Sequence, residues 1–223
     1  MQIDISKPSA TMLQLALDTL FLNEAKKVLN EVADLIDIIE LGTPFILRYG
    51  IRAIEVIKKM FPHLKLLADF KIADAGKYES QLAFDAGADI VTVLATSKDS
   101  TIKAAIKQAE KSNKSIMVDM IGVDSIDKRA AEVDKMNVDY ICAHTGYDEQ
   151  NLNKNPLTNL LKIKKSIIRA KIAVAGGIKL SNLEKIMHEK PDIVIIGSGI
   201  INCSDIRLIT IKIKKIINLK RYI

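Results

Sequence analysis

The sequence predicts an α/β protein of the (β/α)8 TIM-barrel class, formed by a single domain over residues 1–223. Short apolar runs alternate with helical patterns eight times, and each parallel crossover needs a helix to return the chain. A length of 223 residues suits one such barrel. Because no Gly-x-Gly-x-x-Gly motif follows the first strand, closure into a barrel is favoured over an open doubly wound sheet.

The expected strands share one pattern, a run of apolar and β-branched residues bounded by polar residues or glycine. In order they are LQLALD (13–18), DIIE (37–40), KLLADFK (65–71), DIVTVL (89–94), SIMVDM (115–120), YICA (140–143), KIAVA (171–175) and DIVII (192–196). Apolar residues at helical spacing predict helices at 23–33, 51–60, 78–86, 101–111, 125–136, 157–166, 180–188 and 205–219, the last being a terminal helix. Residues 1–11 are expected to form an N-terminal extension.

The composition is that of a globular protein, with 48% hydrophobic and 27% charged residues. No apolar run approaches the roughly 20 residues that span a bilayer, so no membrane partner is expected. The first residues lack the apolar stretch of a signal peptide. These features together predict a cytoplasmic location.

The net charge of +6 raises the question of nucleic-acid binding. Much of the excess lies near the C-terminus, at Lys212, Lys214, Lys215, Lys220 and Arg221, beside isoleucines at helical spacing. That pattern predicts lysines on the solvated face of a packed helix. With no Trp and only 4% aromatic residues, nucleic-acid binding is not expected, whereas a small phosphorylated anion suits the basic balance.

Polar residues and glycines gather at the carboxyl ends of the expected strands, where barrels carry their active sites. The amino ends of the same strands offer no comparable cluster. In chain order the carboxyl ends supply Asp18, Glu40, Asp69, Lys71, Asp119, His144, Gly176, Gly177, Gly197 and Gly199.

The third strand carries charges where a core is expected. Side chains alternate along a strand, so Asp69 and Lys71 share one face and point into the barrel mouth. Asp74 follows in the loop, close enough to join them. A buried ion pair that only fixes the loop is the alternative interpretation. The convergence of Asp18 and Glu40 on the same place favours a functional site.

Glu40 and Asp69, on neighbouring strands, provide hard oxygen ligands of the kind that Mg²⁺ prefers. Such an ion can hold the two oxygens of an enediolate as negative charge develops. Lys71 adds a second positive charge, and Asp18 and Asp74 would keep it protonated and oriented. For Asp18, a helix cap after the first strand is the alternative.

His144 ends the sixth strand, and its ordinary pKa of about 6.5 suits general acid or base work. A hydrogen-bonded core histidine is the alternative interpretation. Asp119 either contributes to the site or pairs with a neighbouring charge, and the residues alone leave both open. After the seventh and eighth strands come two segments that predict a phosphate grip through backbone N–H groups: Ala175, Gly176, Gly177, Gly197, Ser198 and Gly199.

The pattern Asp69-x-Lys71-x-x-Asp74 resembles the signature of the orotidine 5′-phosphate decarboxylase suprafamily. Within it, the surrounding motifs resemble the 3-hexulose-6-phosphate synthase family, over residues 13–205. These motifs are LQLALD, IELGTPF, LADFKIADAG, AGADIVTVL, MVDMIGV, DYICAHTGYD and AVAGGIKL.

The resemblance implies an aldolase that joins formaldehyde to D-ribulose 5-phosphate, giving D-arabino-hex-3-ulose 6-phosphate, with Mg²⁺ or Mn²⁺. Glu40 and Asp69 would be metal ligands and His144 the acid or base. The same resemblance implies a homodimer with sites near the interface, in which Asp74 is supplied across that interface. The pathway implied is the ribulose monophosphate route of formaldehyde fixation.

Two alternatives stay open. The related 3-keto-L-gulonate 6-phosphate decarboxylases make a similar enediolate, but their sequences differ from this one at two positions. They typically carry arginine where this chain has Tyr147 and Ser198, and both departures favour the synthase. The other alternative is a sugar-phosphate-binding barrel without catalysis, which the complete set of acids, lysine and histidine disfavours.

Overall fold

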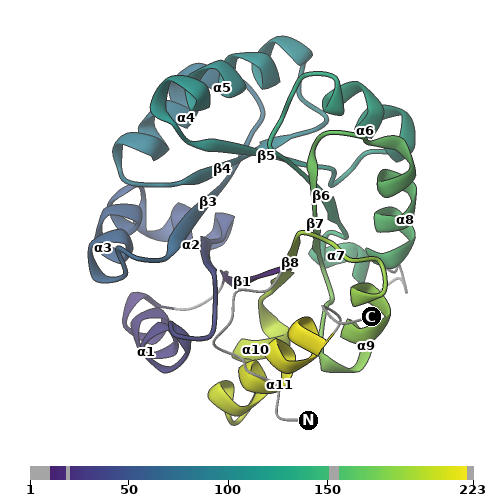
Figure 1. Cartoon of the computed structure of the whole chain (residues 1–223). Helices are drawn as coiled ribbons and strands as arrows, with labels where there is room; N and C mark the ends of the chain where they lie inside the picture. The colour runs from purple at the N-terminus through teal and green to yellow at the C-terminus, as the bar shows by residue number, and fades with distance from the viewer. Residues whose placement is uncertain (1–10, 19–20, 151–155, 220–223) are drawn as a thin grey trace.

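A computed structural model describes residues 11–18, 21–150 and 156–219. Eight parallel strands form a closed barrel in chain order, with β8 paired to β1 (Figure 1). The predicted (β/α)8 fold is therefore confirmed. The strands are β1 (Met12–Leu17), β2 (Ile38–Leu41), β3 (Lys65–Ile72), β4 (Ile90–Leu94), β5 (Ser115–Asp119), β6 (Tyr140–His144), β7 (Lys171–Ala175) and β8 (Ile193–Ile196).

Eight helices of the described chain match the expected ones and surround the barrel (Figure 1). They are α1 (Leu22–Val32), α3 (Arg52–Met60), α4 (Gly76–Asp85), α5 (Asp99–Ser112), α6 (Ile126–Asp134), α8 (Pro156–Ser166), α9 (Leu180–Met187) and α11 (Ile206–Leu219).

Three further short helices were not predicted: α2 (Thr43–Tyr49), α7 (Tyr147–Gln150) and α10 (Ser198–Ile201). They follow β2, β6 and β8, so all three lie in the loops at the carboxyl end of the barrel. Four to seven residues make at most two helical turns, which is too little for apolar spacing to reveal a helix.

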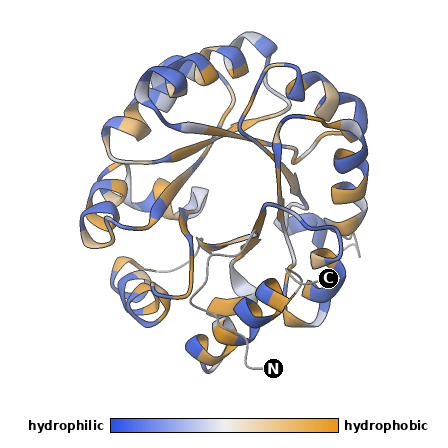
Figure 2. Cartoon of the chain, viewed as in Figure 1, coloured by the Kyte–Doolittle hydropathy of each residue, from blue (hydrophilic) through white to orange (hydrophobic). Residues whose placement is uncertain are grey.

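Two apolar layers hold the barrel together. In β1, Leu13, Leu15 and Leu17 belong to the layer between strands and helices, whereas Ala16 belongs to the smaller layer inside the barrel. Figure 2 shows the same division on the helices, whose apolar residues face the strands while their hydrophilic residues face outward. Because both faces of every strand are covered, the strands read as nearly continuous apolar runs.

Four aspartates form a repeated contact at the amino end of the barrel. Each stands directly before an even-numbered strand and accepts a hydrogen bond from the backbone N–H of the second residue of the preceding strand. The pairs are Asp37 with Leu13 (2.8 Å), Asp89 with Leu66 (3.0 Å), Asp139 with Ile116 (2.9 Å) and Asp192 with Ile172 (2.8 Å). This contact ties neighbouring strands together at the end opposite the expected site.

The terminal helix α11 corrects one prediction. Lys212 and Lys215 are exposed as expected, but Lys214 is only 5% exposed and forms an ion pair with Asp37 at 2.6 Å. A lysine that is buried with a carboxylate partner cannot be recognised from helical spacing alone. The other two basic residues near the C-terminus, and residues 1–10 of the N-terminal extension, lie outside the described residues. None of the described helices is long and apolar enough to cross a membrane.

Candidate active site

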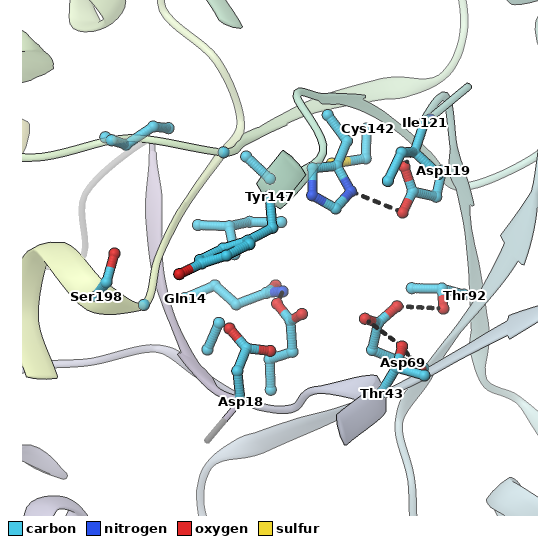
Figure 3. A pocket seen from close by; sticks show the side chains of 18 of the residues that line it. Gln14, Asp18, Thr43, Asp69, Thr92, Asp119, Ile121, Cys142, Tyr147 and Ser198 are labelled. Atoms are coloured by element: carbon cyan, nitrogen blue, oxygen red, sulfur yellow. Dashed lines mark hydrogen bonds and ion pairs between the residues drawn. The ribbon is translucent and has the colours of Figure 1, made fainter. Parts of the chain in front are cut away.

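A cavity of about 600 Å³ opens at the carboxyl ends of the strands (Figure 3). Its walls combine charged side chains from β1 to β6 with glycine-rich backbone after β7 and β8. Most of the expected site residues line it, namely Asp18, Glu40, Asp69, Lys71, His144, Ala175, Gly176, Gly177, Gly197 and Ser198.

Lys71 reaches the cavity through an irregularity in β3. The pairing of β3 with β4 shifts register between Ala68 and Ile72, and Lys71 has a φ of 48°, in the left-handed region that few non-glycine residues adopt. Its backbone N–H donates to Thr92 Oγ1 at 2.9 Å, which holds this conformation. The bulge lets the ammonium group turn back toward Asp69 on the same strand.

Asp69 is the most thoroughly hydrogen-bonded acid of the cavity and is only 4% exposed. It forms an ion pair with Lys71, and its two oxygens accept hydrogen bonds from Thr92 Oγ1 (2.8 Å) and Thr43 Oγ1 (2.9 Å). Burial alone raises the pKa of a carboxyl, but the Lys71 charge and these donors outweigh it and lower the pKa of Asp69. Asp69 is therefore ionised, and Lys71 stays protonated because its pKa is raised by the same pairing, against its own burial.

Glu40 behaves in the opposite way. It lies inside the barrel beside Asp69 and accepts a hydrogen bond from Gln14 Nε2 at 2.5 Å. Burial, followed by the negative charges of Asp69 and Asp18, raises its pKa from 4.5 to about 8. The pKa of Asp18 is raised for similar reasons, burial first and the Asp69 charge second.

These acids fit a divalent cation. Among the described residues, no group of three or more His, Cys, Asp or Glu side chains is arranged to hold a metal ion by itself. Mg²⁺ characteristically takes one or two carboxylates and fills its other positions with water and substrate oxygens, which matches Glu40 and Asp69. The buried Oε1 of Gln14 also has no hydrogen-bond partner among the described residues. The negative charge of Asp69 raises the pKa of Glu40 and of Asp18, and a bound cation would offset this repulsion.

His144 is held by Asp119. Nδ1 of His144 lies 2.8 Å from Asp119 Oδ2, and the other carboxylate oxygen accepts the backbone N–H of Ile121 at 2.9 Å (Figure 3). This contact directs the remaining ring nitrogen away from Asp119. Burial lowers the pKa of His144, but the charge and hydrogen bond of Asp119 raise it more, so the net shift is upward. Lys71 Nζ lies 4.0 Å from Asp119 Oδ2 and links the pair to the lysine.

The two glycine segments meet on one side of the cavity, since β7 and β8 are paired neighbours. Gly176 and Gly177 have φ values of 96° and 67°, which glycine adopts without strain. Gly197 directly precedes α10 and Ser198 begins it, the position at which TIM barrels often bind phosphate. Gly199 does not line the cavity; a Cβ there would stand 2.3 Å from Ile178 O, so it serves close packing of α10.

Asp74 lies apart from this cluster. It is exposed and lines a separate depression with residues of α4 and α5, including Tyr78 and Thr101. The sequence predicted that Asp74 joins the charged residues of its own barrel, but in the structure it lies outside their cavity. Its expected role across a dimer interface stays a prediction.

The polar cavity residues that the sequence analysis missed include Gln14, Thr43 and Thr92, and Asp119 was left undecided. Gln14 and Thr92 sit in mid-strand positions, and Thr43 begins a helix that spacing did not reveal. Reading every inward position of each strand, rather than its last residue alone, would have found Gln14 and Thr92. Asp119 was left open because a carboxylate at a strand end does not disclose its partner.

A cavity of this kind, charged at its floor and set at the carboxyl ends of a closed parallel barrel, is characteristic of enzymes that act on small molecules. Fold and site together define a TIM-barrel enzyme.

Comparison with known proteins narrows this class. Residues 11–208 match the model of the Orotidine 5′-phosphate decarboxylase / HUMPS family, and the chain belongs to this family. A 3-hexulose-6-phosphate synthase of Bacillus subtilis (strain 168) is 49% identical over 205 residues, covering 92% of this chain and 98% of the relative.

Solved structures of similar proteins belong to the same group of enzymes. The crystal structure of a 3-hexulose-6-phosphate synthase from Salmonella typhimurium matches with a TM-score of 0.91 and 42% identity, covering 93% of this chain and 98% of that one. A 3-keto-L-gulonate-6-phosphate decarboxylase from Vibrio cholerae matches with a TM-score of 0.81 and 25% identity, covering 94% and 98%. The family resemblance inferred from the motifs is confirmed, and the chain is a lyase like the synthases it resembles.

Proposed function

We propose that the chain condenses formaldehyde with D-ribulose 5-phosphate to give D-arabino-hex-3-ulose 6-phosphate. The observation that carries this proposal is the joint presence, in one cavity, of an ionised acid–lysine pair and a histidine held by a carboxylate. An enediolate needs a base to form it and positive charge to stabilise it. Relatives named as synthases at up to 49% identity support the substrate assignment.

The chemistry follows from these groups. His144 takes a proton from C1 of ribulose 5-phosphate, and the electron pair moves into a 1,2-enediolate. C1 then attacks the formaldehyde carbon, a C–C bond forms, and the protonated His144 returns its proton to the new alkoxide. Lys71 stabilises the enediolate oxygen, while Asp69, Thr43 and Thr92 keep the ammonium group in place.

A divalent cation, Mg²⁺ or Mn²⁺, held by Glu40 and Asp69, would neutralise negative charge on the enediolate oxygens. The substrate phosphate would contact the backbone of residues 175–177 and 197–198, because TIM barrels frequently bind phosphate after their seventh and eighth strands. A homodimer in which Asp74 reaches the neighbouring site, and a cytoplasmic location, complete the proposal.

The deciding assay combines purified protein, ribulose 5-phosphate, formaldehyde and Mg²⁺, and follows the loss of formaldehyde. Metal-dependent loss that requires ribulose 5-phosphate supports the proposal, and no loss with either metal contradicts it. In a parallel arm, release of CO₂ from 3-keto-L-gulonate 6-phosphate would instead identify a decarboxylase. Tyr147 and Ser198, which stand where those decarboxylases typically carry arginine, argue against that outcome.

A further inference from the structure

Asp18 occupies an unusual position for a carboxylate. It lines the cavity, yet it makes no hydrogen bond or ion pair with the residues that the structure describes. Lys71 and His144 lower its pKa only through space, less than burial and the Asp69 charge raise it. Within the described part of the chain, close packing is therefore the contact that can fix its position.

Gly42, the single residue between β2 and α2, lies directly against this carboxylate. A Cβ atom on Gly42 would stand 1.9 Å from Asp18 Oδ1, 3.0 Å from its Cγ and 3.2 Å from its Cα. Even the smallest side chain at position 42 would thus occupy the space that the Asp18 carboxylate fills. Gly42 has φ −64° and ψ 157°, which any residue adopts. The close approach, and not the backbone conformation, requires glycine.

A second glycine approaches Asp18 from the other flank. β1 lies between β2 and β8 in the barrel, and Gly197 follows β8. A Cβ on Gly197 would stand 3.3 Å from Asp18 Oδ2 and 3.2 Å from the backbone oxygen of Ala16. The two carboxylate oxygens therefore each meet a glycine, and the tighter of the two contacts is at Gly42.

We propose that Gly42 is a positioning residue for Asp18: the absence of a side chain at position 42 creates the space in which the carboxylate stands. From there it faces the cavity, on the side opposite Asp119 (Figure 3). The consequence for turnover rests on the proposed function, in which Asp18 belongs to the charged network. The contact itself does not depend on that function.

The contact is tested by melting temperatures in a double-mutant cycle. Gly42→Ala lowers the melting temperature by about 5 °C when Asp18 is present, because overpacking is destabilising. In Asp18→Ala protein the same change costs less, about 2 °C, since the overlapping oxygen is gone and only the 3.2 Å approach to the Cα atom at position 18 remains. An equal loss in both backgrounds, or no loss in either, contradicts the proposal.

The effect on turnover is measured in the same four proteins. Gly42→Ala lowers kcat about as far as Asp18→Ala, and the double variant is no slower than Asp18→Ala alone. A further loss of about tenfold in the double variant contradicts action through Asp18. Gly146→Ala is the matched control: its Cβ meets only the flexible end of Ile121 at 3.1 Å, so kcat stays within about twofold.

The turnover measurement and the melting temperatures test different claims, so one can fail without the other. If the unaltered protein consumes no formaldehyde, the proposed function is wrong, while the melting temperatures still decide whether Gly42 makes room for Asp18.

Discussion

At the scale of single residues, the cavity works through charges that would be costly to bury alone. Asp69 and Lys71 satisfy each other, and two threonines complete the hydrogen bonds of the aspartate. Asp119 pairs with His144 in the same way. Glu40 is the exception, because Gln14 is its one hydrogen-bond donor among the described residues and its charged neighbours include two acids. A set of purely structural ion pairs would not leave this imbalance, which is why we propose a cation at this site.

Replacing the lysine tests the proposed stabilisation of the enediolate. We expect Lys71→Ala to lower kcat by about 10³-fold, as loss of a preorganised positive group does elsewhere. Thr43 and Thr92 still hold Asp69, so the circular-dichroism spectrum is unchanged. The exposed Lys185 supplies the control, and Lys185→Ala keeps full activity. A Lys71→Ala protein that retains its rate would show that the site is wrongly assigned.

Replacing Asp119 changes the pH dependence. Because Asp119 raises the pKa of His144, the neutral base predominates only at higher pH in the unaltered protein. In Asp119→Asn, burial and the Lys71 charge outweigh the Asp69 charge and lower that pKa, so the rise of kcat/KM with pH moves to lower pH.

The plateau rate in Asp119→Asn also falls, because the imidazolium loses its partner. The exposed Asp124 offers a control, since Asp124→Asn leaves both the profile and the plateau unchanged. A pH profile of Asp119→Asn that coincides with that of the unaltered enzyme would rule out Asp119 as the group that holds His144.

At the scale of elements, the two ends of the barrel have separate tasks. The amino end carries the four aspartates that cap neighbouring strands, and the carboxyl end carries the cavity and the three short helices. Rigid strands thus connect a stabilising end to a functional end.

One aspartate of the amino end provides a test of this division. Asp192→Ala leaves the backbone N–H of Ile172 without its acceptor, which costs about 1 kcal/mol. We expect a melting temperature lower by about 3 °C and an unchanged kcat. Asp192→Asn keeps an acceptor oxygen and should keep most of the stability. A fall in kcat at unchanged stability would show that the two ends are coupled.

Strand and helix positions could be predicted because they depend on periodicity, which the sequence displays directly. The bulge at Lys71 could not, since a single residue in the left-handed region leaves the alternation of neighbouring side chains intact. Asp74 was misplaced relative to its own site for another reason: it lies in a loop, where no period fixes direction. Lys214 shows the same limit on a helix, because burial beside Asp37 depends on a partner 177 residues away.

At the scale of the whole molecule, the protein is basic, but acids are concentrated at the base of its cavity. The raised pKa of Glu40 is a consequence of this concentration of negative charge. Glu40 without a cation has a pKa of about 8, against 4.5 ordinarily, so the folded chain binds more protons than the unfolded one between these values. Stability from this group is therefore present at low pH and is lost as pH rises toward 8.

A cation should reverse that loss, because carboxylates bind metal in their deprotonated form. We expect Mg²⁺ to raise the melting temperature more at pH of about 8 than at about 6, and EDTA to abolish the effect. Glu40→Gln should remove most of the increase at both values. An increase that is equal at both pH values, or that survives Glu40→Gln, would place the cation elsewhere.

The exchange of C1 hydrogen tests the central claim most directly, because it isolates enediolate formation from the aldol step. Ribulose 5-phosphate is incubated with the protein and Mg²⁺ in D₂O without formaldehyde, and deuterium at C1 is followed by NMR. The unaltered protein should incorporate deuterium, and His144→Ala should slow incorporation by about 10²-fold or more. Exchange at an unchanged rate in His144→Ala, or no exchange by a protein that consumes formaldehyde, would contradict the account.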